Sequence, residues 1–431
     1  MNVNDARIPP GPQDKYIVGE NLLEWMDRHF RAFGDIYKAS VYGTSIYATR
    51  DVDVAYHVLV ENWQNYVKGQ SIARVALLLG NGLMVSKGDL WKRQRRMIQP
   101  AFNQEAVVDW MKVFTSTNLD LLKKWQLAAN RNESVNATRD VSSMALEVML
   151  RCIFGEDYEG IAFHFDFIST EFARNIEFVR SFRALGKIIL QIVEERRKSP
   201  RTSNDILDML MRAHDPLSGA PMPDNQLIDE VLTLIVAGHE TTASTLSWCW
   251  YLISQHPASE ETLSKEIDAL PEPLEFGDLS RFVYTRQILE ETMRLFPAGW
   301  IVTRKALHDD HIGQYFVPAG TEIYVGLYFI QRHPALWEQP DCFDPDRFRP
   351  ENLRDRHRLA AIPFSTGPRN CIGALFARTE MQIHLMTIAR YLRLRYVQST
   401  PIELEAGVNL RSRYDFLMYP ELKKQAFKSA G

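Results

Sequence analysis

One stretch decides the fold: Phe364-Ser365-Thr366-Gly367-Pro368-Arg369-Asn370-Cys371-Ile372-Gly373. Its glycine and proline predict a turn, and helical patterning follows directly after the cysteine, from about residue 372 to 391. Amides in the first turn of a helix point back toward the residue that precedes it, so they and the helix dipole favour a thiolate at Cys371. A buried structural cysteine after a turn is the alternative interpretation.

The stretch resembles the haem-binding loop of the cytochrome P450 family, whose pattern is Phe, two residues, Gly, x, Arg, x, Cys, x, Gly. The matching positions are Phe364, Gly367, Arg369, Cys371 and Gly373, and Ser365 stands where many bacterial members carry glycine. The resemblance implies haem b, with Cys371 as the axial ligand of the iron and with Phe364, Arg369 and Gly373 beside the cofactor. A cysteine thiolate donates electron density that promotes O–O cleavage.

A second motif, Ala237-Gly238-His239-Glu240-Thr241-Thr242, interrupts a helical pattern that runs from about residue 225 to 255. Such a helix spans about 45 Å, and Asp224 is expected to cap it. Glycine and a carboxylate are unfavourable inside an apolar helix, whereas threonine can bond to the backbone and leave a groove. A helix kink with a solvated Glu240 is the alternative. By resemblance, Ala237 borders the haem, Thr241 donates a hydrogen bond to bound oxygen, and Glu240 relays protons.

Glu291 and Arg294 share a helix face because they are three residues apart. Taken alone they predict a surface ion pair. By resemblance, they form a buried structural network with Arg347, which follows in Phe343-Asp344-Pro345-Asp346-Arg347-Phe348. The family more often has glutamate where Asp346 stands.

Three arginines match positions that bind the haem propionates in the family. Trp91 and Arg95 lie four residues apart and share a helix face, Arg304 follows a strand-like segment, and Arg369 lies in the cysteine loop. The fixed fork of guanidinium donors suits carboxylates. Each of these arginines, taken alone, would usually be a solvated cation.

Composition predicts an ordinary globular protein. The chain has 431 residues, a net charge of -4, 45% hydrophobic and 24% charged residues, which gives no reason to expect nucleic-acid binding. The cysteines have neither zinc nor disulfide spacing, which favours a reducing cytosol; they are Cys152, Cys249, Cys342 and Cys371. No apolar leader or membrane-spanning stretch is evident, so a cytoplasmic protein is expected.

The predicted fold class is mainly α: the cytochrome P450 fold, with a large helical domain, a small β-rich subdomain, and the haem between the long central helix and the cysteine-loop helix. We expect one domain over residues 1–431. Strand patterns at about 35–50 and 300–330 and in the C-terminal part form the β-rich region. Residues of about 52–298 and 331–391 form the helical part.

The resemblance implies a monooxygenase that inserts one oxygen atom from O2 into a C–H bond of a hydrophobic small molecule: a terpenoid, a fatty acid or another secondary metabolite. Expected substrate contacts lie in 72–85 and 163–182 and at Val236, Ala237, Ala298, Trp300, Ile301 and Val302. The region 158–182 is shorter than the two-helix lid of the family, which predicts a more open channel. A peroxide-driven peroxygenase and a non-catalytic haem protein are the alternatives, and the retained Glu240-Thr241 pair disfavours both.

Electrons are expected to come from NAD(P)H through external partners, a ferredoxin with its reductase or a flavodoxin-type donor. A cluster of Lys92, Arg93 and Arg96 is suited to an acidic partner, although a solvated face explains it as well. We expect a monomer.

Overall fold

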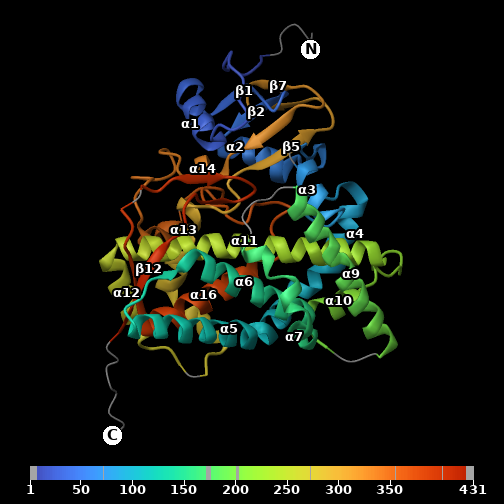
Figure 1. The fold of residues 1–431 in the computed structure, drawn as a ribbon. Coiled ribbons are helices and arrows are strands. Elements are labelled where there is room, and N and C mark those ends of the chain that lie inside the picture. The colour runs from blue at the N-terminus through green and yellow to red at the C-terminus, as the bar shows by residue number, and fades with distance from the viewer. Residues whose placement is uncertain are drawn as a thin grey trace.

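A helix of 32 residues, α11 (Asp224–Gln255), crosses the whole width of the molecule in the computed structural model (Figure 1). It begins after Pro223 and ends before His256-Pro257, and no proline interrupts it. Its closest partner is α6 (Ala137–Phe154). At Gly238 a Cβ atom would lie 2.4 Å from the Met149 Sδ atom on α6, so the glycine allows the two helices to pack closely.

The structure describes residues 7–70, 72–170, 176–199, 203–271, 273–354, 356–399 and 401–423. The helices in this part are α1 (Leu22–Phe33), α2 (Val52–Tyr56), α3 (Ile72–Leu79), α4 (Gly88–Ile98), α5 (Gln104–Asn130), α6, α7 (Tyr158–Ile161), α8 (Phe167–Thr170), α9 (Ile176–Lys198), α10 (Ile206–Arg212), α11, α12 (Pro257–Ile267), α13 (Val283–Leu295), α14 (Leu327–Ile330), α15 (Pro350–Leu353) and α16 (Ala374–Tyr391). The strands are β1 (Ile36–Val41), β2 (Thr44–Thr49), β3 (Tyr66–Lys68), β4 (Val135–Asn136), β5 (Val302–Ala306), β6 (Asp310–Ile312), β7 (Tyr315–Val317), β8 (Glu322–Val325), β9 (Leu392–Tyr396), β10 (Leu404–Ala406), β11 (Leu410–Ser412) and β12 (Leu417–Leu422).

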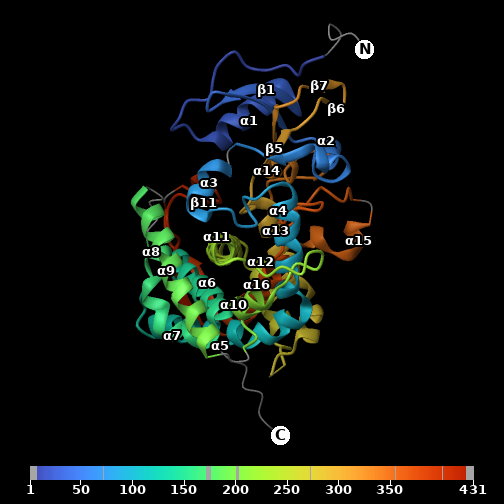
Figure 2. The same cartoon turned by 90° about the vertical axis from the view of Figure 1, so that its right-hand side faces the viewer.

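A five-stranded sheet of order β1-β2-β8-β5-β3 forms a separate lobe above α11 (Figure 1). Its strands pair antiparallel except β2 with β8, which are parallel. Seen along α11, the helical lobe surrounds that helix, with α8 and α9 on one side and α4 on the other (Figure 2). The prediction of a mainly α fold with a small β-rich part is confirmed.

Three local expectations were wrong. Asp224 does not cap α11: Pro223 takes the N-cap position, and the Asp224 carboxylate pairs with Arg197 at 2.5 Å. The segment 66–68 was expected to be helical but forms β3, which pairs with β5. Because β5 is distant in sequence, the local pattern gave no sign of this pairing. The strand-like alternation around 327–329 is the short helix α14.

None of the helices in the described ranges combines the length and apolar character that a membrane span needs. The expected absence of an apolar leader at residues 1–6 lies outside the described residues.

Candidate active site

Cys371 lies in a tight loop directly before α16. Its N–H donates to the Phe364 carbonyl at 2.9 Å, and the Asn370 N–H donates to the Gly367 carbonyl at 3.0 Å. Gly373 takes the N-cap position of α16, and its amide donates a hydrogen bond to the Cys371 sulfur. The predicted turn and helix start therefore place one amide donor on the sulfur.

Gly367 fixes where this loop sits. Its φ of 74° lies in the left-handed region, as does the φ of 59° at Ser365. A Cβ atom on Gly367 would lie only 2.0 Å from the carbonyl oxygen of Leu59. Leu59 belongs to a π-helical turn, His57–Glu61, and such turns are frequent at functional sites. Only glycine allows the loop to pack against this turn.

Two opposing influences act on the pKa of the Cys371 thiol. Burial raises its pKa, while the Gly373 amide and the guanidinium groups of Arg95 and Arg378 act to lower it, and burial dominates. Solvent can still reach the side chain, although protein atoms surround it closely. Burial therefore outweighs the amide and the two guanidinium groups in setting the pKa of the Cys371 thiol.

Arg95 binds the cysteine loop. Its guanidinium donates to the Asn370 backbone carbonyl at 2.7 Å and to the Asn370 side-chain oxygen at 3.0 Å. On the same face of α4, Trp91 is buried, and the Arg369 guanidinium lies 4.1 Å from the centre of its ring. The structure thus brings Trp91, Arg95 and Arg369 together around Cys371.

A cluster of cations lies beside this loop. Burial lowers the pKa of Arg304 and of Arg369, each to about 10, and burial together with these two arginines lowers the pKa of Lys68 to about 7. Within the described ranges, no carboxylate forms an ion pair with any of the three. Charges gathered without counter-ions suit a ligand that brings two carboxylates, as haem does. The residues present therefore fit haem.

Lys68 was missed by the sequence analysis. It is the last residue of β3 and pairs in register with Arg304 on β5. Tyr66 and Val67 are residue types that favour strands, but a segment of three residues is too short to identify a strand from sequence.

Thr241 bonds to its own helix. Its hydroxyl donates to the Ala237 carbonyl at 2.7 Å, and the Thr245 hydroxyl donates to the Thr241 carbonyl at 3.0 Å. This is the side-chain bond to the backbone that the sequence predicted for a threonine in a helix. α11 is nevertheless continuous through this point, so no break interrupts the helix.

Glu240 precedes Thr241 on α11 and lines a cavity along that helix. Its Oε2 atom accepts a hydrogen bond of 2.9 Å from the side-chain amide of Asn409, in the turn between β10 and β11. Asn409 was also missed by the sequence analysis, because no local pattern relates a C-terminal turn to a helix about 170 residues earlier.

A buried carboxylic acid lies on the opposite side of this motif. Glu380 on α16 is fully buried beside the Thr242 hydroxyl, and burial raises the pKa of its carboxyl well above the usual range. Burial therefore favours the protonated form of this acid. Glu380 lies where α16 packs against α11, one residue along from Thr241.

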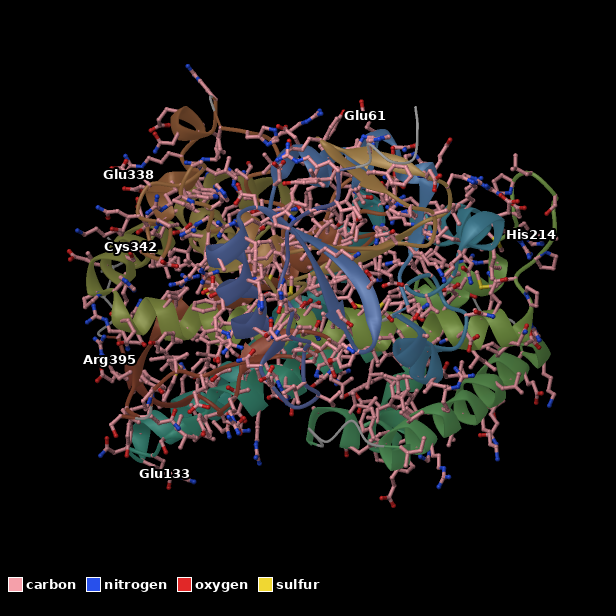
Figure 3. The ribbon with its side chains drawn as sticks, turned by 90° about the horizontal axis from the view of Figure 1, so that it is seen from above. Glu61, Glu133, His214, Glu338, Cys342 and Arg395 are labelled. Atoms are coloured by element: carbon pink, nitrogen blue, oxygen red, sulfur yellow. The ribbon has the colours of Figure 1, made fainter. Side chains whose placement is uncertain are left out.

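Glu291, Arg294 and Arg347 form one network. Arg294 donates to both Glu291 carboxylate oxygens, at 2.6 and 2.8 Å, and both side chains have no exposed surface. Arg347 lies 3.4 Å from the same carboxylate. The two arginines also donate to the carbonyls of Glu338 and Cys342, which lie together at one edge of the molecule (Figure 3).

A cavity of about 960 Å³ lies along α11 and is within the range of small-molecule sites. Val236, His239, Glu240, Ala243 and Ser244 line it from that helix. Much of its remaining wall is apolar and comes from α3, the 80–88 loop, α8 and α9: Val75, Leu78, Met84, Ile168, Phe178 and Val179. A polar end is formed by the start of α6 and the 405–415 segment.

The cavity only partly matches the expected substrate contacts. Ranges 72–85 and 163–182 and Val236 contribute to it, with residues 171–175 outside the described part. Cys371 and Thr241 are not among its lining residues. Trp300 was expected to contact substrate but is buried in the core of the sheet lobe, where its indole N–H donates to the Gly407 carbonyl at 3.0 Å. The expected short lid consists of α7, one 3₁₀ turn and α8, each of three or four residues.

The basic cluster on α4 is largely occupied. Arg96 pairs with the buried Asp215 at 3.0 Å, Arg93 donates to the Pro221 carbonyl at 2.9 Å, and Lys92 pairs with Asp89 at 3.1 Å. Asp215 and Pro221 belong to the loop between α10 and α11, in which Figure 3 labels His214. This loop neutralises part of the charge that was expected to attract an acidic partner.

Comparisons with known proteins agree with this geometry. The family described as "Cytochrome P450" matches residues 11–162 and 161–418. The chain is 29% identical over 404 residues to cyclooctatin synthase of Streptomyces melanosporofaciens, covering 88% of this chain and 87% of that protein. It is 30% identical to cyclooctat-9-en-7-ol 5-monooxygenase of the same organism, covering 86% of this chain and 85% of that protein. It is also 30% identical to human cytochrome P450 4F2, covering 73% and 69%.

Solved structures share the fold. The haem domain of cytochrome P450DA superposes with a TM-score of 0.86 at 22% identity, covering 97% of both chains. A cytochrome P450 named CYP102L1 superposes with a TM-score of 0.84 at 21% identity, covering 97% of this chain and 100% of the other.

Proposed function

Because the chain belongs to the cytochrome P450 family, and is therefore a haem-dependent monooxygenase, we propose that it oxidises a C–H bond of a terpenoid held in the cavity along α11. The observation that carries this proposal is that Glu240 lies in the cavity wall and is followed in sequence on α11 by Thr241. An acid and a hydroxyl at this place can bring protons to the reaction, which a peroxygenase and a non-catalytic haem protein do not need.

The proposed cofactor is haem b, which supplies the activation of dioxygen when bound. Cys371 would hold the iron as a thiolate, the form in which cysteine binds metal ions. The Gly373 amide, Arg95 and Arg378 would stabilise this anion. The two propionates would be held by Trp91, Lys68, Arg304 and Arg369.

The protein residues near the cavity have distinct proposed roles. Glu240 takes protons from the solvent side, and the Thr241 hydroxyl passes them on. Glu291, Arg294 and Arg347 have a structural role beneath the cofactor. Thr241 and Thr245 make the same bond to the helix backbone one turn apart, so that bond alone does not give Thr241 its role.

A terpenoid substrate is supported by two features. Two bacterial relatives carry the names cyclooctatin synthase and cyclooctat-9-en-7-ol 5-monooxygenase. The walls that α3, α8 and α9 contribute to the cavity are apolar, and its volume of about 960 Å³ admits a molecule of many carbons. A fatty acid is the second candidate, because leukotriene-B4 omega-hydroxylase 3 of Mus musculus is 28% identical over 359 residues.

Electrons are proposed to come from NAD(P)H through a ferredoxin and its reductase, or through a flavodoxin-type donor, to a monomeric enzyme. The partner would approach from the side of α4, where Arg95 reaches the cysteine loop.

The test uses the haem-loaded enzyme with NADPH, a ferredoxin and its reductase. Diterpene alcohols and fatty acids are screened for a shift of the main haem absorption band, and those that bind are incubated under ¹⁸O2. The proposal predicts a product that carries one ¹⁸O atom from a terpenoid. Thr241→Ala should divert NADPH oxidation to hydrogen peroxide, whereas the matched control Thr245→Ala should not. Product formed equally well from hydrogen peroxide alone would favour the peroxygenase, and no product from any binder would favour a non-catalytic haem protein.

A further inference from the structure

We propose that His57 is a positioning residue that holds the cysteine loop in place through the π-helical turn His57–Glu61. This inference rests on the proposed ligation of haem by Cys371, because it acts on the loop that carries this ligand. The observation behind it is that the His57 ring lies between two carboxylates. Its Nδ1 atom lies 2.8 Å from Glu61 Oε2, and its Nε2 atom lies 2.9 Å from Asp310 Oδ2 on β6.

These two contacts fit the charged form of the imidazole. A neutral imidazole carries one N–H, so it could donate to only one of the carboxylates, whereas the imidazolium donates to both. Tyr66 on β3 also faces the ring, with 6.4 Å between the two ring centres. Burial acts to lower the pKa of His57, but the hydrogen bonds and charges of Glu61 and Asp310 outweigh it and raise this pKa above its usual value of 6.5.

Asp310 connects both ends of the turn to strands β3 and β6. Besides the bond to His57, its Oδ2 atom accepts from the Asn62 side-chain amide at 3.0 Å and from the Tyr66 hydroxyl at 2.7 Å. Asn62 directly follows the turn, and its N–H donates to the His57 carbonyl at 2.8 Å. Burial acts to raise the pKa of Asp310, but its hydrogen bonds outweigh burial and lower the pKa, so the group is a carboxylate at neutral pH.

The turn in its place supports the cysteine loop. The π-helix is a rare conformation, so contacts from outside the turn are expected to hold it. Leu59, at the centre of the turn, is buried, and a Cβ atom on Gly367 would overlap its carbonyl oxygen. The two backbones are therefore in direct contact, and Cys371 follows Gly367 by four residues. A displacement of the turn should displace the sulfur.

The support depends on pH because the His57 side chain is 25% exposed and Glu61 lies at the surface (Figure 3). The pKa of His57 is higher in the folded protein than in the unfolded chain. Its contribution is therefore complete below pH 6.5 and is lost as the pH rises through the pKa of the folded protein. When the ring loses a proton, one of the two carboxylates loses its donor.

The test measures haem transfer to apomyoglobin from the haem-loaded wild type and from His57→Gln, between pH 6 and pH 9. Glutamine can donate but carries no charge, so it resembles the neutral ring. At pH 6 the variant should lose haem about 5 to 10 times faster than the wild type, because a charge-assisted hydrogen bond at a partly exposed site is lost. The ratio of the two rates should fall toward one at pH 9. The fraction of reduced protein with a carbon-monoxide band at about 450 nm should follow the same pH profile.

Three controls isolate the charge on His57. Glu61→Gln removes one carboxylate at the surface and should move the midpoint of the wild-type transition to lower pH. His311→Gln changes an exposed histidine on the same strand as Asp310 and should lose haem at the wild-type rate at every pH. Because the pKa of Lys68 is lowered to about 7, the comparison is repeated in a Lys68→Met background, where the effect of His57→Gln should remain.

The outcomes separate this inference from its premise. If the wild type binds no haem, or lacks the carbon-monoxide band, the proposed ligation by Cys371 and the role of His57 fail together. If the wild type has the band and His57→Gln loses haem at the wild-type rate at pH 6, the role of His57 is refuted and the proposed function stands. A rate that is raised by the same factor at every pH would show a merely structural role and would also refute the inference.

Discussion

Replacing Lys68 with methionine should stabilise the apoprotein and weaken its hold on haem. Burial and two neighbouring guanidinium groups lower the pKa of Lys68 from 10.5 to about 7. At 1.36 kcal/mol per unit, this shift corresponds to about 5 kcal/mol of unfavourable free energy for the charged form in the folded apoprotein. The Lys68 side chain keeps some solvent exposure, and solvent screens its charge, so half of this free energy, about 2–3 kcal/mol, is expected to act on stability.

The sign of the pH dependence follows from this shift. Below pH 10.5 the unfolded chain holds the Lys68 proton, whereas the folded apoprotein takes it up only near pH 7. The stability of the wild-type apoprotein therefore falls as the pH decreases from 10.5 to 7. Lys68→Met should raise the free energy of unfolding at pH 7, and the gain should disappear near pH 10.5.

The haem-bound protein should respond in the opposite direction. A haem propionate would favour the charged form of Lys68 and accept a hydrogen bond from it. Such a charge-assisted hydrogen bond contributes about 1.5–3 kcal/mol. Haem should therefore dissociate from the variant about 10 to 100 times faster than from the wild type. The assays are urea unfolding of the apoprotein and haem transfer to apomyoglobin. Lys38→Met, at an exposed position of β1 in the same sheet, is the matched control. A Lys68→Met apoprotein less stable than wild type at pH 7, or an unchanged rate of haem loss, would refute the reasoning.

Three further changes test the scaffold. Gly367→Ala forces a Cβ to within 2.0 Å of the Leu59 carbonyl oxygen at a φ of 74°. The variant should retain less haem, measured as the ratio of haem to protein absorbance. A ratio equal to that of the wild type would contradict the packing argument. Glu380→Gln should raise the urea concentration at the unfolding midpoint at pH 8 but not at pH 4. Burial raises the pKa of Glu380 in the folded protein, whereas the unfolded chain ionises this group above its ordinary pKa of 4.5, so the acid destabilises the fold only above that pH. An equal effect of the substitution at both pH values would contradict this argument. Glu291→Gln leaves Arg294 buried without its ion partner and should destabilise the fold by about 3–5 kcal/mol, and a loss below about 1 kcal/mol in chemical unfolding would show that the pair is not needed.

The sequence predicted those parts of the site that are local in the chain. The cysteine loop, the α11 motif and the Glu291–Arg294 pair each lie within ten residues or fewer, so turn chemistry and helix periodicity predicted their local structure. Periodicity alone predicted a surface ion pair for Glu291 and Arg294, and only the resemblance predicted that the pair is buried. The resemblance to a family then supplied the partners that are far apart in sequence, such as Arg347.

Contacts between distant segments were not visible in this way. Lys68 meets Arg304 only because β3 pairs with β5, and Asn409 meets Glu240 only because the β10–β11 turn lies on α11. Burial is a further effect of the assembled fold: the Gly373 amide lowers the pKa of Cys371, and the surrounding protein raises it by more. The effect of burial depends on the assembled fold and cannot be read from one loop.

The central claim is that the Cys371 sulfur binds haem iron as a thiolate. The most direct measurement is the absorption spectrum of the purified, reduced protein under carbon monoxide, together with that of Cys371→Ser. We predict a band at about 450 nm for the wild type, as thiolate ligation requires, and its loss in the variant. A wild-type spectrum without that band, or a Cys371→Ser protein with the same spectrum and haem content as the wild type, would contradict the account.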